Sequence, residues 1–292
     1  MEKKKETKVI TTVSGYQKSA VKKQLIQSIL RNDLEPSCHW CAELVKSGDF
    51  ADVWECVLLV FGKHVHAANP KLALYLQLRA DTFRTLASTN DTKTLHTLES
   101  VRKLFTEMMC LMCTSPRKHA LDEVPVDPKD FQLSVLRTKV KAPTIEVHLK
   151  HGDPLELVAP FNELLYSLRT KRSLDACYWL EWVLMYEKTC AKKKSRCKAA
   201  KRDYLGGRTE CVWIFWDLLL KETEGKIADK YARATLRLYC IQYGTTDKDF
   251  RRFLLYFAIA LVCDPIDFTL ELPMDKAGIS AVCAKHALFY AS

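Results

Sequence analysis

The chain has 292 residues, enough for two ordinary domains, and contains 48% hydrophobic and 27% charged residues, as soluble globular proteins do. This composition argues against disordered chains, collagen and coiled-coil arrays. Only 9 glycines occur, and because phosphate-cradling loops and Rossmann turns need glycine, most nucleotide-binding enzymes are disfavoured. The net charge of +10 suits a polyanion, a membrane surface or an acidic protein as partner.

The cysteines and the first residues predict a protein that is not secreted. Twelve cysteines are too sparse for a disulfide-stapled scaffold. The start, Met1-Glu-Lys-Lys-Lys, is polar and unlike a secretory signal. The longest apolar run, residues 253–263, is too short to span a membrane. We therefore expect a reducing compartment and mostly free thiols.

Apolar residues at helical spacing predict a helical domain over residues 15–113, after a polar tail over 1–14. Val21, Leu25 and Ile29, for example, recur on one helix face. Gly48 is expected to end a helix, and Asn69-Pro70 to begin one. The expected helices cover residues 16–32, 36–48, 49–61, 70–86 and 95–113.

Six of the ten prolines fall within residues 114–160, which we interpret as a linker or arm. Proline breaks helices and favours extended chain. Residues 131–140 and 144–149 could therefore form short strands or an arm over a neighbouring subunit. The fold class we predict is all-α, with two helical domains joined by a proline-rich, partly extended segment.

The second helical domain is expected over residues 161–292, with a basic helix projecting from it. The pairs Trp179/Trp182 and Trp213/Trp216 repeat 34 residues apart, but two copies are too few for a helical-repeat array and fit a buried core. The expected helices cover residues 160–170, 174–202, 209–222, 227–243, 247–263 and 275–290.

Two cysteine pairs have the spacing of zinc ligands, Cys38-x2-Cys41 and Cys110-x2-Cys113. The pairs are 69 positions apart and lie in apolar helical sequence, whereas zinc folds bring their second pair much closer along the chain. We expect these cysteines to be small core residues and no metal to be bound. Walker, deaminase and zinc-protease motifs are absent from the sequence. We therefore predict no enzyme activity, no cofactor and no small-molecule substrate.

The remaining feature is a basic segment between residues 188 and 202, which has no acidic residue and leaves a net charge of only +2 for the rest of the chain. As a helix charged almost all round, it would project from its domain. It suits contact with phosphates rather than stacking on bases, since no aromatic residues alternate with the lysines. The alternative is a solvated helix end that only aids solubility. The predicted polyanion-binding residues are Lys188, Lys192, Lys193, Lys194, Arg196, Lys198, Lys201 and Arg202.

Residues 28–48, which contain Ser28-Ile-Leu-Arg-Asn-Asp and Cys38-His-Trp40, resemble the helical C-terminal region of clamp-loader-related AAA+ ATPases. The ATPase module of that family is missing, so ATP hydrolysis is not implied. Asn69-Pro70-Lys71-Leu72 and Cys177-Tyr-Trp-Leu-Glu-Trp182 make the whole chain look like an uncharacterised family encoded by nucleocytoplasmic large DNA viruses. That resemblance implies a virion component, made in the host cytoplasm or nucleus.

These expectations combine into a hypothesis about function. The leading interpretation is a non-enzymatic structural or assembly protein of a large DNA virus, a minor capsid protein that contacts other viral structural proteins and a polyanionic surface. That surface would be duplex DNA or an anionic membrane. The alternative is a DNA-binding accessory protein of viral genome replication or packaging, whose helical domain would act like a clamp-loader collar.

Overall fold

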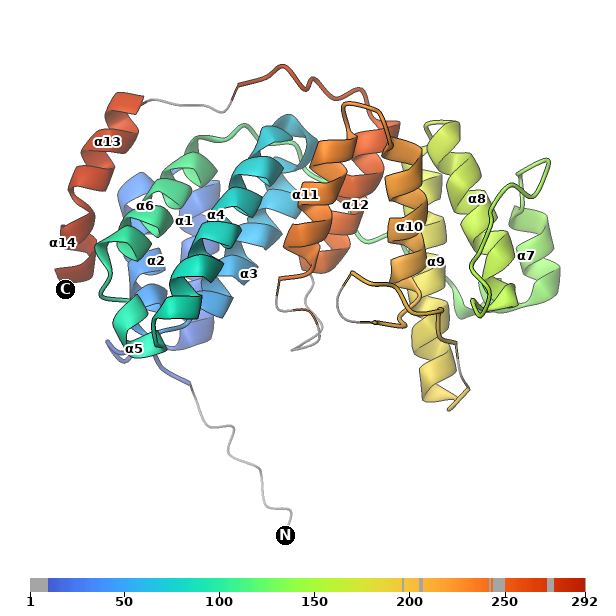
Figure 1. Cartoon of the computed structure of the whole chain (residues 1–292), viewed down its shortest axis with the longest axis horizontal. Helices are drawn as coiled ribbons and strands as arrows, with labels where there is room; N and C mark the ends of the chain where they lie inside the picture. The colour runs from blue at the N-terminus through green and yellow to red at the C-terminus, as the bar shows by residue number, and fades with distance from the viewer. Residues whose placement is uncertain are drawn as a thin grey trace, which may run out of the picture. The chain divides into compact units, whose positions relative to one another are not determined.

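The computed structural model describes residues 10–195, 197–204, 207–241, 243, 250–271 and 276–291. Within these ranges the chain is helical and contains no β-strand, so the prediction of an all-α fold is confirmed (Figure 1). Isolated β-bridges join Thr11 to Gln17 and Arg202 to Arg208. None of the described helices is both long and apolar enough to cross a bilayer.

The chain forms two compact units whose boundaries differ from the domain limits expected from the sequence. The first unit comprises Met1–His119, Gly244–Arg251 and Thr269–Ser292. The second comprises Ala120–Tyr243 and Arg252–Phe268. The proline-rich segment beyond residue 119 therefore belongs to the second unit, and the C-terminal helices belong to the first.

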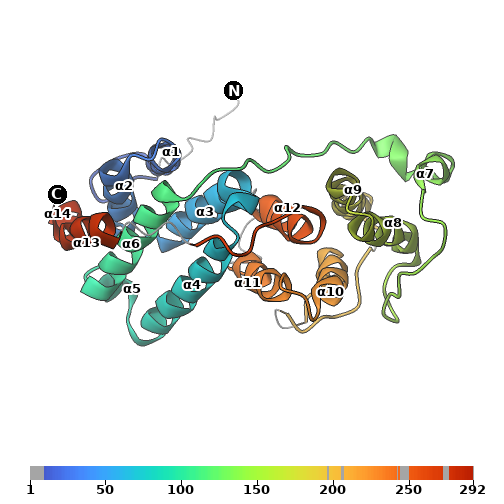
Figure 2. The same cartoon turned by 90° about the horizontal axis from the view of Figure 1, so that it is seen from above.

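The first unit is a set of helices packed directly on one another. Helix α2 packs against α1 and α6, while α13 packs on α6 and α14 on α2 (Figure 2). Gly48 ends α2 in a left-handed conformation with φ of 74°, as its place in the sequence predicts. The helices are α1 (Lys18–Leu30), α2 (Leu34–Lys46), α3 (Phe50–Val60), α4 (Lys71–Thr89), α5 (Thr92–Leu95), α6 (Glu99–Thr114), α13 (Lys276–Ala284) and α14 (His286–Ala291).

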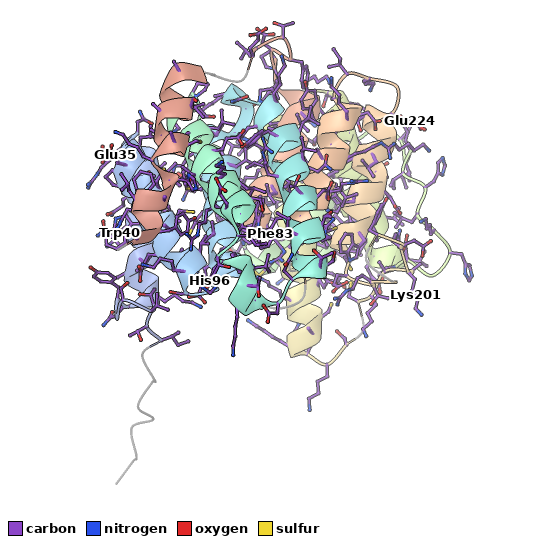
Figure 3. The ribbon with its side chains drawn as sticks, turned by 60° about the vertical axis from the view of Figure 1, so that its left-hand side comes forward. Glu35, Trp40, Phe83, His96, Lys201 and Glu224 are labelled. Atoms are coloured by element: carbon purple, nitrogen blue, oxygen red, sulfur yellow. The ribbon has the colours of Figure 1, made fainter. Side chains whose placement is uncertain are left out.

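Aromatic rings fill the space between α3, α4 and α6 in the first unit. Phe83, labelled in Figure 3, lies with its ring centroid 5.0 Å from that of Phe50 and 5.4 Å from that of Phe105. Trp54 stands 6.1 Å from Phe105 in an edge-on arrangement. Such pairs add to the free energy gained from burying the rings, so this cluster fixes how the three helices pack.

The second unit is built around α8, α9, α10 and α11, with α8 packed along α9 and α10 on α11. All four tryptophans of the repeated pairs are buried, which confirms that they belong to the core. Trp182 donates a hydrogen bond to the carbonyl oxygen of Asp130 at 3.2 Å, so its ring also holds the preceding segment. The helices are α7 (Leu133–Lys139), α8 (Val158–Arg169), α9 (Ser173–Lys192), α10 (Val212–Thr223), α11 (Asp229–Tyr239) and, from Arg252 on, α12 (Phe250–Cys263).

The proline-rich segment is fastened to its own unit by two buried side chains of α8. Asn162 accepts hydrogen bonds from the backbone N–H groups of Glu146 at 2.7 Å and Val147 at 3.2 Å, and donates to the carbonyl of Thr144. Glu163 accepts from the N–H groups at positions 141 and 142. Residues 133–139 form α7, so the strand considered for 131–140 is wrong, and residues 144–149 have no regular secondary structure, so the strand considered there is wrong as well.

Candidate polyanion-binding surface

The basic segment is not one helix to residue 202, because α9 ends at Lys192. Lys194 adopts a left-handed conformation with φ of 57°. Its N–H donates to the carbonyl of Ala191 and that of Ser195 to Cys190, at 3.1 and 3.0 Å. These two bonds form a Schellman motif, in which the left-handed position is usually glycine. The chain therefore reverses, and the described residues 192–195 and 197–202, here called the lysine loop, return toward the unit.

Buried contacts hold the returning part of the lysine loop. Cys197 is 8% exposed, and its sulfur lies 3.6 Å from the sulfur of Cys211 at the start of α10. The N–H of Ala199 donates to the carbonyl of Thr209 at 2.7 Å. Because alternate positions of the loop are buried here, the side chains between them face solvent.

Arg202 anchors the end of the loop and is not available to a polyanion, which corrects its place among the predicted binding residues. Its side chain is 2% exposed. Two of its nitrogens bind the carboxylate of Asp153, with Nη2 2.7 Å from Oδ2, and Nε lies 2.8 Å from Oδ2 of Asp217. Bidentate pairs of this kind are strong and geometrically specific. We call Arg202, Asp153 and Asp217 the arginine clamp.

The electrostatics of the arginine clamp match its geometry. Burial alone would raise the pKa of Asp153, but the hydrogen bonds from Arg202 and from the backbone outweigh burial, and the pKa lies below its usual value. Asp217 also accepts a hydrogen bond from the hydroxyl of Tyr204 at 2.7 Å, and Lys150 lies 3.3 Å from it. The clamp therefore ties the loop to α10 and to residues 150–153.

Five lysines of the loop are exposed and free of ion pairs to any described residue. Lys188 is also exposed, on the last turns of α9, and already has an interaction partner. Arg196 lies outside the described residues. Lys201 is labelled in Figure 3. The exposed lysines are Lys192, Lys193, Lys194, Lys198 and Lys201.

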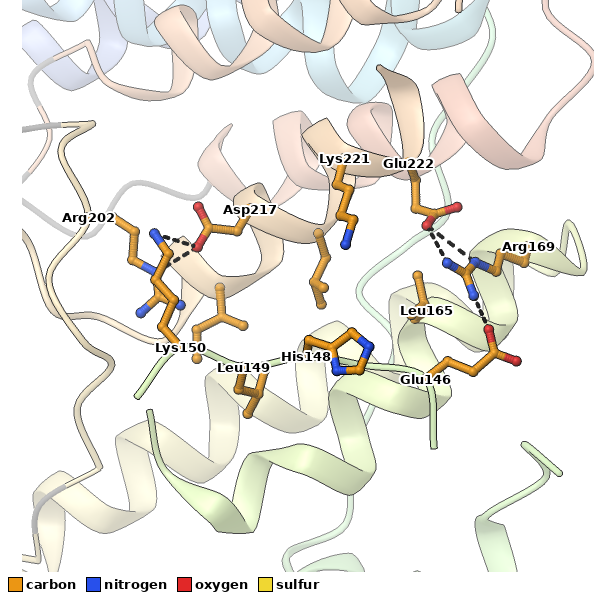
Figure 4. Close-up of a pocket in the computed structure, with 12 residues that line it drawn as sticks. Glu146, His148, Leu149, Lys150, Leu165, Arg169, Arg202, Asp217, Lys221 and Glu222 are labelled. Carbon is orange, nitrogen blue, oxygen red and sulfur yellow. Dashed lines mark hydrogen bonds and ion pairs between the residues drawn. The ribbon is translucent and has the colours of Figure 1, made fainter. Parts of the chain in front are cut away.

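A cavity of about 270 Å³ adjoins the arginine clamp, between α8, α10 and residues 146–150 (Figure 4). At one end are Asp217 and Arg202. At the other end Arg169 binds Glu222, with 2.8 Å between Nη2 and Oε1, and also binds Glu146. The two arginines and the three acidic side chains of the lining are thus all engaged with one another.

Residues 148–151 contribute to this surface but were not predicted from the sequence. His148, Lys150 and His151 are exposed and precede the clamp residue Asp153. The basic pattern His148-Leu-Lys-His151 was visible in the sequence, yet nothing local indicates that it lies beside the lysine loop. The contact is shown by Asp153, whose carboxylate accepts from the N–H groups of both Lys150 and Ala200, each at 2.8 Å.

The structure brings the two cysteine pairs together, on the facing sides of α2 and α6. A hydrogen bond between the thiols of Cys38 and Cys110 raises the pKa of Cys38 and lowers that of Cys110. Cys113 donates to the hydroxyl of Ser37 at 3.2 Å. Across the described ranges, no three or more histidine, cysteine or acidic side chains are grouped so as to hold a metal ion.

Comparison with known proteins gives no relative. No protein-family model, no curated protein and no solved structure matches this chain significantly. The resemblances to clamp-loader ATPases and to a viral family therefore stay predictions, and function has to be argued from the surface itself.

Proposed function

We propose that this chain is a non-enzymatic helical protein that binds duplex DNA through its phosphates, with the lysine loop as the contact surface. The observation that carries the proposal is the set of exposed, unpaired lysines on a loop anchored at both ends. Phosphate contacts need charge at defined positions and no base-specific geometry. Because the loop is tied down by the Schellman motif and by the arginine clamp, binding would order little additional chain.

In the viral setting that the sequence resemblance implies, such a surface would face the genome. It suits the minor capsid protein that the sequence favours, and also the alternative, an accessory protein of replication or packaging. Mass spectrometry of purified virions separates the two. A fixed ratio to the major capsid protein would support the first, and absence from particles that still contain DNA would support the second.

Exposed apolar side chains on the proline-rich segment support a role in assembly. Leu133 is 62% exposed, Ile145 is 72% exposed and Leu155 is 83% exposed. Single exposed apolar residues are common, but three on one segment fit contact with other structural proteins. In this proposal the segment is an interface held on its own unit, since Asn162 and Glu163 fasten it.

Charge substitution tests the proposal of DNA binding. Replacing Lys192, Lys193, Lys198 and Lys201 with glutamine should weaken binding of a duplex at low salt by about a hundredfold, because phosphates that the protein no longer neutralises keep their counterions. The matched control replaces Lys23, Lys93, Lys129 and Lys230, which are also exposed, and changes the net charge equally. Equal weakening by both sets would show that net charge alone matters, and the loop would then be only a solubilising surface.

A further inference from the structure

The cavity beside the arginine clamp holds two basic side chains that the ion pairs around it leave unused. Lys221 projects from α10, and His148 comes from the segment fastened by Asn162. In Figure 4 these two side chains point toward one another from opposite walls of the cavity. Neither forms an ion pair or hydrogen bond with a described residue. The unpaired hydrogen-bond donors of the cavity are therefore concentrated at its middle.

The acidic residues of the lining do not oppose an anion at that point. Glu222 and Glu146 are held by Arg169. Asp217 is shared among Arg202, Lys150 and Tyr204. An anion between Lys221 and His148 would thus meet two uncommitted donors. A phosphate monoester suits this place best, since it offers three acceptor oxygens and up to two negative charges to donors on opposite walls.

The rest of the lining is apolar and comes from Leu149, Leu165, Ile214 and Leu218. Small-molecule sites combine apolar walls with a few converging polar groups in this way. The apolar walls fit a flat body attached to the phosphate. The cavity shares Arg202 with the end of the lysine loop, and Lys150 of its lining is paired with the clamp residue Asp217. The cavity therefore lies next to the end of that loop, within reach of the terminal residue of a strand bound there.

We infer that the cavity binds a nucleoside 5′-monophosphate, with the phosphate between Lys221 and His148 and the base against the four apolar side chains. The nucleotide is either free or the 5′-terminal residue of a DNA strand, and the chemistry recognised is the same. The second source rests on the proposed DNA binding, whereas the first does not.

Calorimetry on the full chain tests the site with adenosine 5′-monophosphate and with adenosine as probes. The monophosphate should bind, and adenosine should bind at least tenfold more weakly because it lacks the charge-assisted hydrogen bonds. Lys221→Met and His148→Gln should each weaken the monophosphate by about tenfold or more. Lys93→Met, at an exposed lysine of the first unit, is the matched control and should change nothing.

A second arm compares duplexes with 5′-phosphate and 5′-hydroxyl ends. A preference for the phosphorylated end that is lost in Lys221→Met identifies the strand terminus as the source. Binding of the free monophosphate without an end preference identifies a free nucleotide. If neither probe depends on Lys221, the inference is overturned, even when the lysine loop still binds duplex DNA. If the wild-type protein binds adenosine 5′-monophosphate but does not bind duplex DNA, only the proposed function is overturned.

Discussion

At the scale of single residues, Lys194 occupies a backbone position that glycine would occupy at lower cost. A left-handed conformation costs a side-chain-bearing residue about 1–2 kcal/mol. Glycine avoids this cost, but the greater conformational entropy of glycine in the unfolded chain offsets part of the stabilisation. We predict that Lys194→Gly raises the free energy of unfolding by up to about 1 kcal/mol while weakening duplex binding. Urea unfolding and DNA titration measure the two effects.

Lys171 provides the control for this prediction, because it ends α8 in the same motif with φ of 59°. Lys171→Gly should relieve the same backbone strain, lose the hydrogen bond of Lys171 to the carbonyl of Val262, and remove one positive charge without changing duplex affinity. If Lys194→Gly and Lys171→Gly behave alike in DNA binding, the residue at position 194 serves only the turn.

Arg202 has a structural role that its basic character does not show. Arg202→Met would leave the carboxylate of Asp153, which is fully buried, without its partner. Removing one member of a buried pair typically costs about 3–5 kcal/mol. We predict a loss of this size in the urea unfolding of the second unit. The double variant Arg202→Met with Asp153→Leu should recover part of it, because Asp217 keeps Lys150 and Tyr204 as partners while the N–H groups of Lys150 and Ala200 lose their acceptor. A single variant as stable as wild type would contradict the clamp.

At the scale of elements, the proline-rich segment depends on Asn162. This side chain is 5% exposed and makes three hydrogen bonds to backbone groups of residues 144–147. Asn162→Ala would leave two N–H groups without acceptors, at a cost of about 2–3 kcal/mol. We predict faster tryptic cleavage at Lys141 and Lys150 in this variant. Unchanged cleavage there would show that the segment is held by other contacts.

The helices could largely be predicted from the sequence, but the end of α9 could not. Apolar spacing and stop residues such as Gly48 are local signals, and they located most helices to within a few residues. Between Cys190 and Tyr204 the sequence has neither glycine nor proline, so nothing local indicates the reversal at Lys194. The contact that stabilises the returning loop joins Arg202 to Asp153, 49 positions earlier in the chain.

Only the part of the site that depends on neighbouring residues in the sequence could be predicted. The lysines that remain exposed were visible as a charge cluster, because clustering is a property of neighbours in sequence. The cavity was missed, since His148 and Lys221 line it together although they lie far apart in the sequence. The strand considered for 131–140 failed because proline density was interpreted as extended chain, whereas Leu133–Lys139 contains no proline and forms a helix.

At the scale of the whole molecule, the C-terminal helices complete the first unit. Tyr290 of α14 is 8% exposed, and the guanidinium carbon of Arg102 of α6 lies 4.8 Å from the centre of its ring. We predict that Tyr290→Ala destabilises the first unit by about 3 kcal/mol, as is typical for a buried aromatic residue. Hydrogen exchange should then quicken in α2 and α6 and not in α8 or α10. Faster exchange in α8 and α10 instead would contradict this assignment.

The central claim, that the lysine loop binds DNA phosphates, is tested most directly by the salt dependence of duplex binding. If the five exposed lysines each neutralise one phosphate, the logarithm of the binding constant should fall against that of salt concentration with a slope of about −4.5, at −0.9 per phosphate. The variant in which glutamine replaces Lys192, Lys193, Lys198 and Lys201 should give a slope of about −1. Equal slopes for the variant and the wild type would contradict the claim.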